Sequence, residues 1–357
     1  MLSVPAFQPL IPEGRDQGDP YLLTVSGDHP TMWKHYVYIT GEDAARKSAF
    51  PVYGSNDLRQ WQPLGDSLVM AHQSAHWAPC VVYRPGLAKP FVMLYSCSKG
   101  FGDLAHVGHA IRRAESEQPE GPFVDTGQNL TPEIDFAIDP DVYTRPDGRL
   151  MLAFAKDFND DEPHGVAIVE VEISDDLTEL RGEFRLLTRP RYEWQVFDPA
   201  RSTSWRAGST QESSPEAVRW SNVEAPVGGL NSPSGKPVYL YSGGCFFGFY
   251  AIGALIEDDG ELRDVTDDDP NFVVRPQPDR GIYAPGHCSL IRKGGDGDEV
   301  IGLMLHARFG TPQAPRQMCV APLQWREDDL PVAVLPFSDS PWQRFRFWLT
   351  RTLTGGA

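Results

Sequence analysis

Apolar residues along the chain occur in short runs separated by polar turns, a pattern typical of β-strands. Five of these runs, VYIT, FVMLYS, LMLAFA, VYLYSG and GLMLHA, have the length of single strands. Turns such as RPDG, SPSG and GGDGDE separate paired runs, and their Gly, Pro and Asp residues favour hairpins. Helical turns are expected only at residues 177–186 and in the last dozen residues. The pattern therefore predicts an all-β protein.

The apolar runs belong to a repeat of about sixty residues. Each unit opens with a polar or aromatic residue and ends in an apolar run, and the units begin at Asp19, Trp77, Asp139, Glu224 and His287. A repeat of this length with several strands per unit is typical of a β-propeller. We therefore predict one domain over residues 1–357, a five-bladed β-propeller. A β-sandwich is the alternative, but it does not explain the period.

One interval between units is longer than the others. The unit that opens at Asp139 is followed by the next only after 85 residues, whereas the other intervals are 58, 62 and 63 residues. The excess lies at about residues 186–221, a stretch rich in Arg, Ser and Trp. We interpret it as an inserted loop within the single domain.

Three carboxyl groups share the same position in the repeat. The first strand of each propeller blade lines the central channel, so Asp19, Asp139 and Glu224 should meet at one mouth of it. Glycoside hydrolysis needs a carboxylic acid at the leaving oxygen and a carboxylate that acts on water or on the anomeric carbon. A third carboxylate raises the pKa of the acid by repulsion. The trio is thus the predicted catalytic set; the alternative is a pair of turn aspartates and a solvated glutamate.

Three further residues are predicted to bind substrate. Trp77 offers an aromatic platform to a sugar, although a core aromatic is the alternative. His287 is expected to orient a carboxylate or, through water, to contribute to a metal site; a structural histidine is the alternative. Arg308 follows the last apolar run and is predicted to bind sugar hydroxyls or a carboxylate, where the alternative is an exposed loop arginine.

Composition narrows the classes of function. The formal net charge of −17 argues against binding to nucleic acid or to an anionic membrane surface, but a neutral sugar is compatible with it. The five cysteines are widely spaced without a C-x-x-C pair, so we expect small buried residues and neither a zinc site nor a disulfide framework. The N-terminal residues show no signal peptide and no apolar run reaches membrane-spanning length, so we expect a cytoplasmic protein.

The order and spacing of several motifs resemble glycoside hydrolase family 43, which includes arabinofuranosidases, xylosidases and arabinanases. The motifs are GDPYLL, HWAPCVV, FAIDPDVYTRPDGRLML, VEAPVGG, GHCSLI, MLHARFG and RQMCVAPLQW. The resemblance implies an inverting hydrolase with Asp19 as general base, Asp139 as pKa modulator and Glu224 as general acid. It also implies that His287 is the axial histidine found beside a calcium ion or a water molecule. No cofactor is required, and a structural calcium ion on the propeller axis is a further expectation.

Two departures from the family pattern shape the expected specificity. Ala225 stands where the acid motif of the family more often has glycine, and only about 30 residues follow Trp325, too few for the C-terminal β-sandwich of many xylosidases. We therefore favour an exo-acting α-L-arabinofuranosidase over a β-D-xylosidase or another furanosidase. The sequence also leaves open a non-catalytic sugar-binding propeller, a retaining fructosidase and a mannoside phosphorylase. The fructosidase would need Glu-Cys in place of Glu224-Ala225. The phosphorylase would need a cluster of basic residues that binds phosphate, for which the arginines of residues 189–206 are the candidates.

Overall fold

The computed structural model describes residues 6–11, 16–25, 30–43, 45–70, 74–98, 108–158, 162–202, 217–266, 271–293 and 299–334. Within these ranges the chain forms β-strands and two short 3-10 turns, η2 (Glu193–Gln195) and η4 (Pro278–Arg280), and no α-helix. The all-β prediction is therefore confirmed. The helical turn predicted at 177–186 is wrong, because Leu180–Thr188 is strand β13 and pairs with β12. The last dozen residues, also suggested as helical, lie outside the described part.

Antiparallel pairing sorts twenty of the twenty-two strands of these ranges into five successive groups of four. The first two groups are β1 (Gly18–Thr24), β2 (His35–Thr40), β4 (Ser48–Ser55) and β5 (Gln62–Val69), then β6 (Ser74–Tyr83), β7 (Phe91–Ser98), β8 (His109–Ser116) and β9 (Phe123–Asn129). The third is β10 (Ala137–Thr144), β11 (Leu150–Phe158), β12 (Gly165–Ile173) and β13. The last two are β15 (Ala217–Asn231), β16 (Pro237–Gly244), β17 (Tyr250–Asp258) and β18 (Glu261–Asp264), then β19 (Ile282–Arg292), β20 (Val300–Phe309), β21 (Arg316–Trp325) and β22 (Pro331–Ala333).

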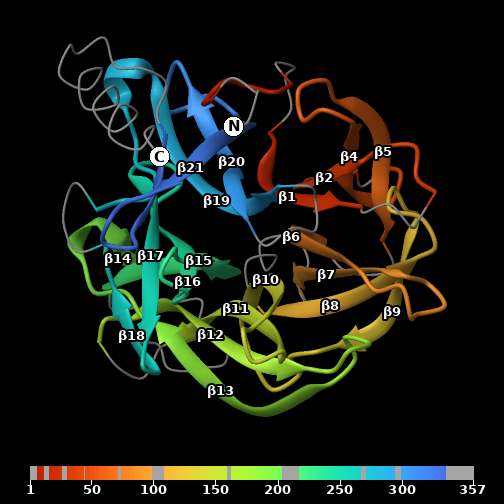
Figure 1. Ribbon diagram of the computed structural model, residues 1–357, viewed down its shortest axis with the longest axis horizontal. Helices are drawn as coiled ribbons and strands as arrows, with labels where there is room; N and C mark the ends of the chain where they lie inside the picture. Colours follow the sequence, from red (N-terminus) through yellow and green to blue (C-terminus); the bar gives the residue numbers. More distant parts are fainter. Residues whose placement is uncertain are drawn as a thin grey trace, which may run out of the picture.

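The groups curl around a common centre, and the first strand of each group lies innermost (Figure 1). Contacts between these inner strands run from β1 to β6, β10, β15 and β19 and back to β1, which closes a ring. Buried side chains fill the space between neighbouring groups; one cluster joins Leu240 and Ile252 of the fourth group to Leu303 and Cys319 of the fifth. This arrangement brings residues far apart in sequence to one centre.

The remaining strands are β3 (Glu42–Asp43), which pairs with β4, and β14 (Val196–Ser202). Strand β14 belongs to the stretch at 186–221 that we interpreted as an inserted loop. It pairs with β15 in an antiparallel manner, with Asp198 opposite Trp220, so part of the predicted loop is a strand. Residues 203–216 of that stretch lie outside the described residues. Strand β14 thus stands beside the strand that carries Glu224.

Each inner strand contains a β-bulge at the same place. The pairing register shifts there, and one residue adopts a positive φ angle: Asp19, Ala78, Asp139, Ala225 and His287, with φ values between 48° and 58°. A bulge adds one residue to a strand and re-aims the side chains next to it. In the second and fourth groups, the residues equivalent to Asp19, Asp139 and His287 are therefore Ala78 and Ala225. The residues predicted to open those two repeats, Trp77 and Glu224, each lie one residue earlier in the chain.

The N–H group at each bulge is held by a side chain of the preceding group. Four acceptors occupy equivalent positions on the second strand of that group, and we call them the bulge acceptors: Thr40 Oγ1 for Ala78 (2.9 Å), Ser96 Oγ for Asp139 (2.9 Å), Ser242 Oγ for His287 (2.8 Å) and His306 Nδ1 for Asp19 (3.1 Å). The contact from His306 to Asp19 joins the last group to the first and so helps to close the ring.

The third group lacks a bulge acceptor, because its equivalent residue is Ala155, which lies opposite Ile138. A methyl group cannot accept a hydrogen bond. The Ala225 N–H group donates instead to Asp139 Oδ2, at 3.1 Å. The carboxylate of Asp139 is therefore fixed directly beside Glu224.

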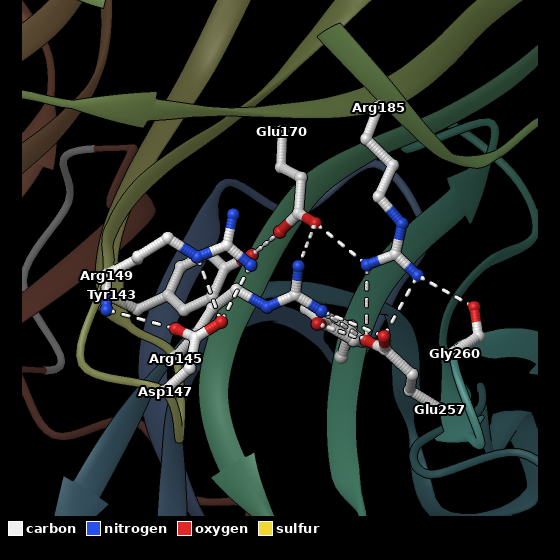
Figure 2. A network of polar contacts seen from close by, with 9 residues as sticks. Tyr143, Arg145, Asp147, Arg149, Glu170, Arg185, Glu257 and Gly260 are labelled. Carbon is white, nitrogen blue, oxygen red and sulfur yellow. Dashed lines mark hydrogen bonds and ion pairs between the residues drawn. The ribbon is translucent and has the colours of Figure 1, made fainter. Parts of the chain in front are cut away.

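A buried network of ion pairs joins the third and fourth groups (Figure 2). Glu170 on β12 accepts hydrogen bonds from Arg145 at 3.1 Å and Arg185 at 3.0 Å, and also from Tyr143. Glu257 on β17 binds the same two arginines, at 2.7 Å and 3.1 Å. Two cations and two anions of this network thus compensate each other across the boundary between the groups.

Two expectations from composition can be compared with the structure. All five cysteines are free, and four of them are buried: Cys80, Cys97, Cys288 and Cys319. Among the described residues there is no helix of the length and apolar character that a membrane crossing requires.

Candidate active site

A pocket of about 510 Å³ lies where the inner strands meet. Five of the six residues singled out in the sequence line it, one from the inner strand of each group: Asp19, Trp77, Asp139, Glu224 and His287. Arg308 is not among the lining residues. The structure thus brings the three carboxyl groups of the predicted trio into one cavity.

Asp19 is the buried anion of the pocket. Its Oδ1 accepts a hydrogen bond from Arg316 Nη1 at 3.0 Å and lies 3.1 Å from His287 Nδ1, while Thr40 donates to its Oδ2 at 2.6 Å. Burial alone would raise the pKa of Asp19, but the attraction of Arg316 and His287 outweighs it and holds this pKa well below its usual range. The carboxylate is therefore ionised and can accept a proton.

His287 is the cation at the centre of the carboxyl groups. Burial opposes its protonation, but the negative charges of Asp19, Asp139 and Glu224 raise its pKa to about 9. At neutral pH the ring is thus an imidazolium that compensates part of the negative charge. A protonated imidazole has no free lone pair for a metal ion.

The expected metal site has no further support in the described ranges. No three His, Cys, Asp or Glu side chains in these ranges are placed to hold a metal ion. Side chains alone therefore do not form a calcium site among the described residues, and the axial calcium ion and the water-mediated metal role of His287 stay predictions.

Glu224 and Asp139 are the carboxyl groups that can hold a proton. Burial and repulsion by Asp19 raise the pKa of Glu224, although hydrogen bonds from Asn222 and from Tyr250 Oη, the latter at 2.7 Å, oppose this. Burial, followed by repulsion from Glu224 and Asp19, raises the pKa of Asp139 to about 7. Both shifts favour the protonated forms of this pair, whereas the lowered pKa of Asp19 favours its ionised form.

The supporting residues Arg316, Tyr250 and His306 were not identified as site residues from the sequence. Arg316 contacts Asp19 and is itself held by Asp16, whose Oδ2 lies 2.9 Å from Arg316 Nε. The Tyr250 ring stacks on His306 with ring centroids 5.9 Å apart. Arg316 opens the RQMCV motif, which was a signal of its importance but not of its contact with Asp19.

Aromatic rings form much of the remaining wall. Trp77 stacks on His109 with centroids 4.0 Å apart, so one face of the indole is covered by protein. Further rings line the pocket from β14, β15 and the turn after β16: Phe197, Trp220, Phe246 and Phe247. The cavity therefore combines a charged centre with an apolar, aromatic wall, as expected for a ligand with both polar and apolar surfaces.

Arg308 lies behind this wall. Its Nε donates to the carbonyl oxygen of Phe246 at 3.2 Å, and its Nη1 donates to the carbonyl oxygen of Ala314. Its guanidinium carbon lies 5.8 Å from the centre of the Phe247 ring. The arginine is thus placed to support the turn, and its predicted contact with substrate stays a prediction.

Comparisons with known proteins agree with this geometry. The model of glycosyl hydrolases family 43 matches residues 20–209, more than half of the chain. A search of curated protein sequences gives no match. Among solved structures, a thermostable family-43 glycoside hydrolase is 24% identical with a TM-score of 0.66, and the alignment covers 91% of this chain and 95% of the other.

Two other structures are similar in fold. An endo-1,4-β-xylanase from Bacteroides thetaiotaomicron is 20% identical with a TM-score of 0.65, and the alignment covers 90% of this chain and 95% of the other. An exo-1,5-α-L-arabinanase from a bovine ruminal metagenomic library is 18% identical with a TM-score of 0.60, with 90% and 97% covered. From the family match, which spans the first three groups of strands, the chain belongs to glycosyl hydrolases family 43 and is a glycoside hydrolase.

Proposed function

We propose that the protein is an inverting, exo-acting hydrolase of α-L-arabinofuranosides, built as a single five-bladed β-propeller. The observation that carries the proposal is the separation of pKa values in one pocket: Asp19 lowered, Asp139 and Glu224 raised. Acid–base catalysis needs one group that is ionised and another that is protonated at the same pH. The five groups of strands, which close into a ring, are the blades in this proposal.

In the proposed reaction Asp19 is the general base and Glu224 the general acid. Asp19 takes a proton from a water molecule, whose oxygen attacks the anomeric carbon. The bond between that carbon and the glycosidic oxygen breaks, and Glu224 gives its proton to the departing oxygen. Asp139 keeps the pKa of Glu224 high by repulsion. Arg316 and His287 keep Asp19 ionised and oriented through contacts of 3.0 Å and 3.1 Å.

The choice of sugar rests on the structures of similar fold and on the wall of the pocket. The structures of similar fold include an exo-1,5-α-L-arabinanase and an endo-1,4-β-xylanase, so β-D-xylosides and other furanosides are the alternative substrates. The aromatic wall with Trp77 is suited to the apolar face of a sugar ring. A phosphorylase would need cations in the pocket for phosphate; of the arginines in 189–202, only Arg201 lines it.

A panel of nitrophenyl α-L-arabinofuranoside, β-D-xyloside and galactofuranoside tests the substrate. NMR of the first product formed should show inversion at the anomeric carbon, and turnover should not depend on phosphate. Retention of configuration would contradict the mechanism, as would a separation of about 5 Å between the carboxyl groups of Asp19 and Glu224 in a crystal structure, where inversion requires about 6.5–9.5 Å.

The role of Asp19 is tested by Asp19→Asn, with Asp147→Asn as matched control. Asp147 lies in the exposed turn between β10 and β11, where it pairs with Arg149. Asp19→Asn should lower kcat by about a thousandfold without a loss of folded protein, because it removes the base, and Asp147→Asn should behave like wild type. Near-native turnover of Asp19→Asn would show that Asp19 is not the base.

A further inference from the structure

The aromatic wall of the pocket stands on the elements that flank the proposed acid. Phe197 lies on β14, which pairs with β15, and Phe246 and Phe247 lie in the turn between β16 and β17. The ring centroids of Phe197 and Phe246 are 5.9 Å apart, and those of Phe246 and Phe247 are 4.2 Å apart. We call these three rings the phenylalanine shelf.

The shelf is fixed in place although its outer ring is exposed. The Cys245 N–H group donates to the Phe249 carbonyl at 2.8 Å and closes the turn, and Arg308 holds the Phe246 carbonyl at 3.2 Å. Tyr250, which donates to Glu224, follows the turn directly. The turn thus links the shelf to the acid through one short segment.

Phe247 is the most exposed ring of the shelf. It is 68% exposed, and yet it lines the pocket. An exposed ring in the wall of a pocket presents apolar surface to water. Such a surface favours binding of a ligand with an apolar face. A sugar ring offers such a face through its C–H groups.

The place of the shelf determines which part of a glycoside can reach it. The leaving oxygen must meet Glu224 to receive its proton, so the leaving group extends from the anomeric carbon past this residue. Both elements that carry the shelf adjoin the strand that carries Glu224, because β14 and β16 each pair with β15. Phenylalanine has no polar atom, so it cannot select a hydroxyl pattern.

We propose that the phenylalanine shelf, with Phe247 as its outermost contact, binds the leaving group of the substrate by stacking, and that it accepts a sugar or an aromatic ring with little selection among hydroxyl configurations. This inference rests on the proposed function, because it uses Glu224 as the acid. It assigns the insertion that carries β14 a role in binding the leaving group.

The test compares a substrate that spans the acid with a ligand that does not. The probes are α-1,5-linked arabinobiose as substrate and L-arabinose as competitive inhibitor, or xylobiose and D-xylose if the wild-type enzyme hydrolyses xylosides. For Phe247→Ala we expect kcat/KM on the disaccharide to fall roughly tenfold, through KM, because stacking is lost. The inhibition constant of the monosaccharide should stay unchanged, because that sugar occupies the place of the sugar that carries the anomeric carbon and does not reach the shelf.

Two variants serve as controls. Phe249→Ala removes a ring from the same turn that is 44% exposed but does not line the pocket, and it should behave like wild type. Phe247→Trp keeps an aromatic face and should retain most of the activity on the disaccharide. Equal kcat/KM for Phe247→Ala and wild type would overturn the inference, and so would an equal loss in monosaccharide binding. A wild-type protein that hydrolyses no glycoside would overturn the proposed function itself, and this inference with it.

Discussion

The ion-pair network between the third and fourth groups gives a sharp prediction about stability. Glu170 is fully buried and Arg145, Arg185 and Glu257 are 11%, 32% and 11% exposed at the side chain. In Figure 2 the two carboxylates lie between the two guanidinium groups, so the charges cancel. Glu170→Gln keeps the shape of the side chain but removes one of the two negative charges. It leaves two arginines with one carboxylate.

The expected cost follows from burial. Removing one partner of a buried ion pair typically destabilises a protein by about 3–5 kcal/mol, since an uncompensated charge remains. Water reaches about a third of the Arg185 side chain, which lowers the cost toward the smaller value. We therefore expect Glu170→Gln to lower the free energy of unfolding by about 3 kcal/mol.

Urea unfolding, followed by tryptophan fluorescence, measures this difference. The matched control is Glu172→Gln, two residues along β12 on the same face, where the glutamate is half-buried and a change under about 0.5 kcal/mol is expected. Because the network does not line the pocket, folded Glu170→Gln should keep its hydrolytic activity. A loss of stability no larger than that of Glu172→Gln would refute the account of the network as a compensated buried set.

Three further predictions concern the pocket. Asp139→Asn should lower the pKa of Glu224 and move the basic limb of the profile of kcat/KM against pH to lower pH; an unmoved limb would leave Asp139 a purely structural residue. Glu224→Gln should reduce hydrolysis of glycosides with poor leaving groups more than that of nitrophenyl glycosides, and an equal loss on both would argue against its role as acid. His287 has a pKa of about 9 in the folded protein and about 6.5 when unfolded, so its stabilisation is full below pH 6.5 and is lost as pH rises through 9. The difference in unfolding free energy between wild type and His287→Gln should shrink by about 3 kcal/mol from pH 6 to pH 10 in urea titrations, and a constant difference would contradict it.

The fold class and the meeting of the site residues could be predicted because both follow from spacing. The apolar runs repeat with the strands, so Asp19, Asp139 and His287 were placed at equivalent positions. The one-residue error at Trp77 and Glu224 arises from the bulges, since strand pairing with a period of two takes no account of an extra residue. The sequence did contain a feature that marks the bulge positions, because proline follows residues 19, 78, 139 and 225.

Other parts of the site depend on contacts that a repeat does not encode. Arg316 reaches Asp19 across almost the whole length of the chain, and its position in the RQMCV motif says nothing about the direction of its side chain. Arg308 sits where an arginine could face a ligand, but two backbone carbonyls bind it instead. Strand β14 was not foreseen because its pairing partner lies beyond a segment of low apolar content.

The exception among the bulge acceptors explains how Asp139 is placed for the proposed role. In four groups a neutral side chain or a histidine holds the next bulge, but Ala155 cannot, so the Asp139 carboxylate holds the Ala225 N–H group. Ala225 directly follows Glu224, and the hydrogen bond therefore holds the Asp139 carboxylate against the backbone that carries Glu224. A backbone donor favours the ionised form of Asp139, whereas burial and the charge of Glu224 oppose it, and the pKa of about 7 shows that the second effect is larger. The contact that closes this part of the ring is thus the one that keeps a second carboxyl group beside the acid, and in this sense the fold and the proposed chemistry depend on the same hydrogen bond.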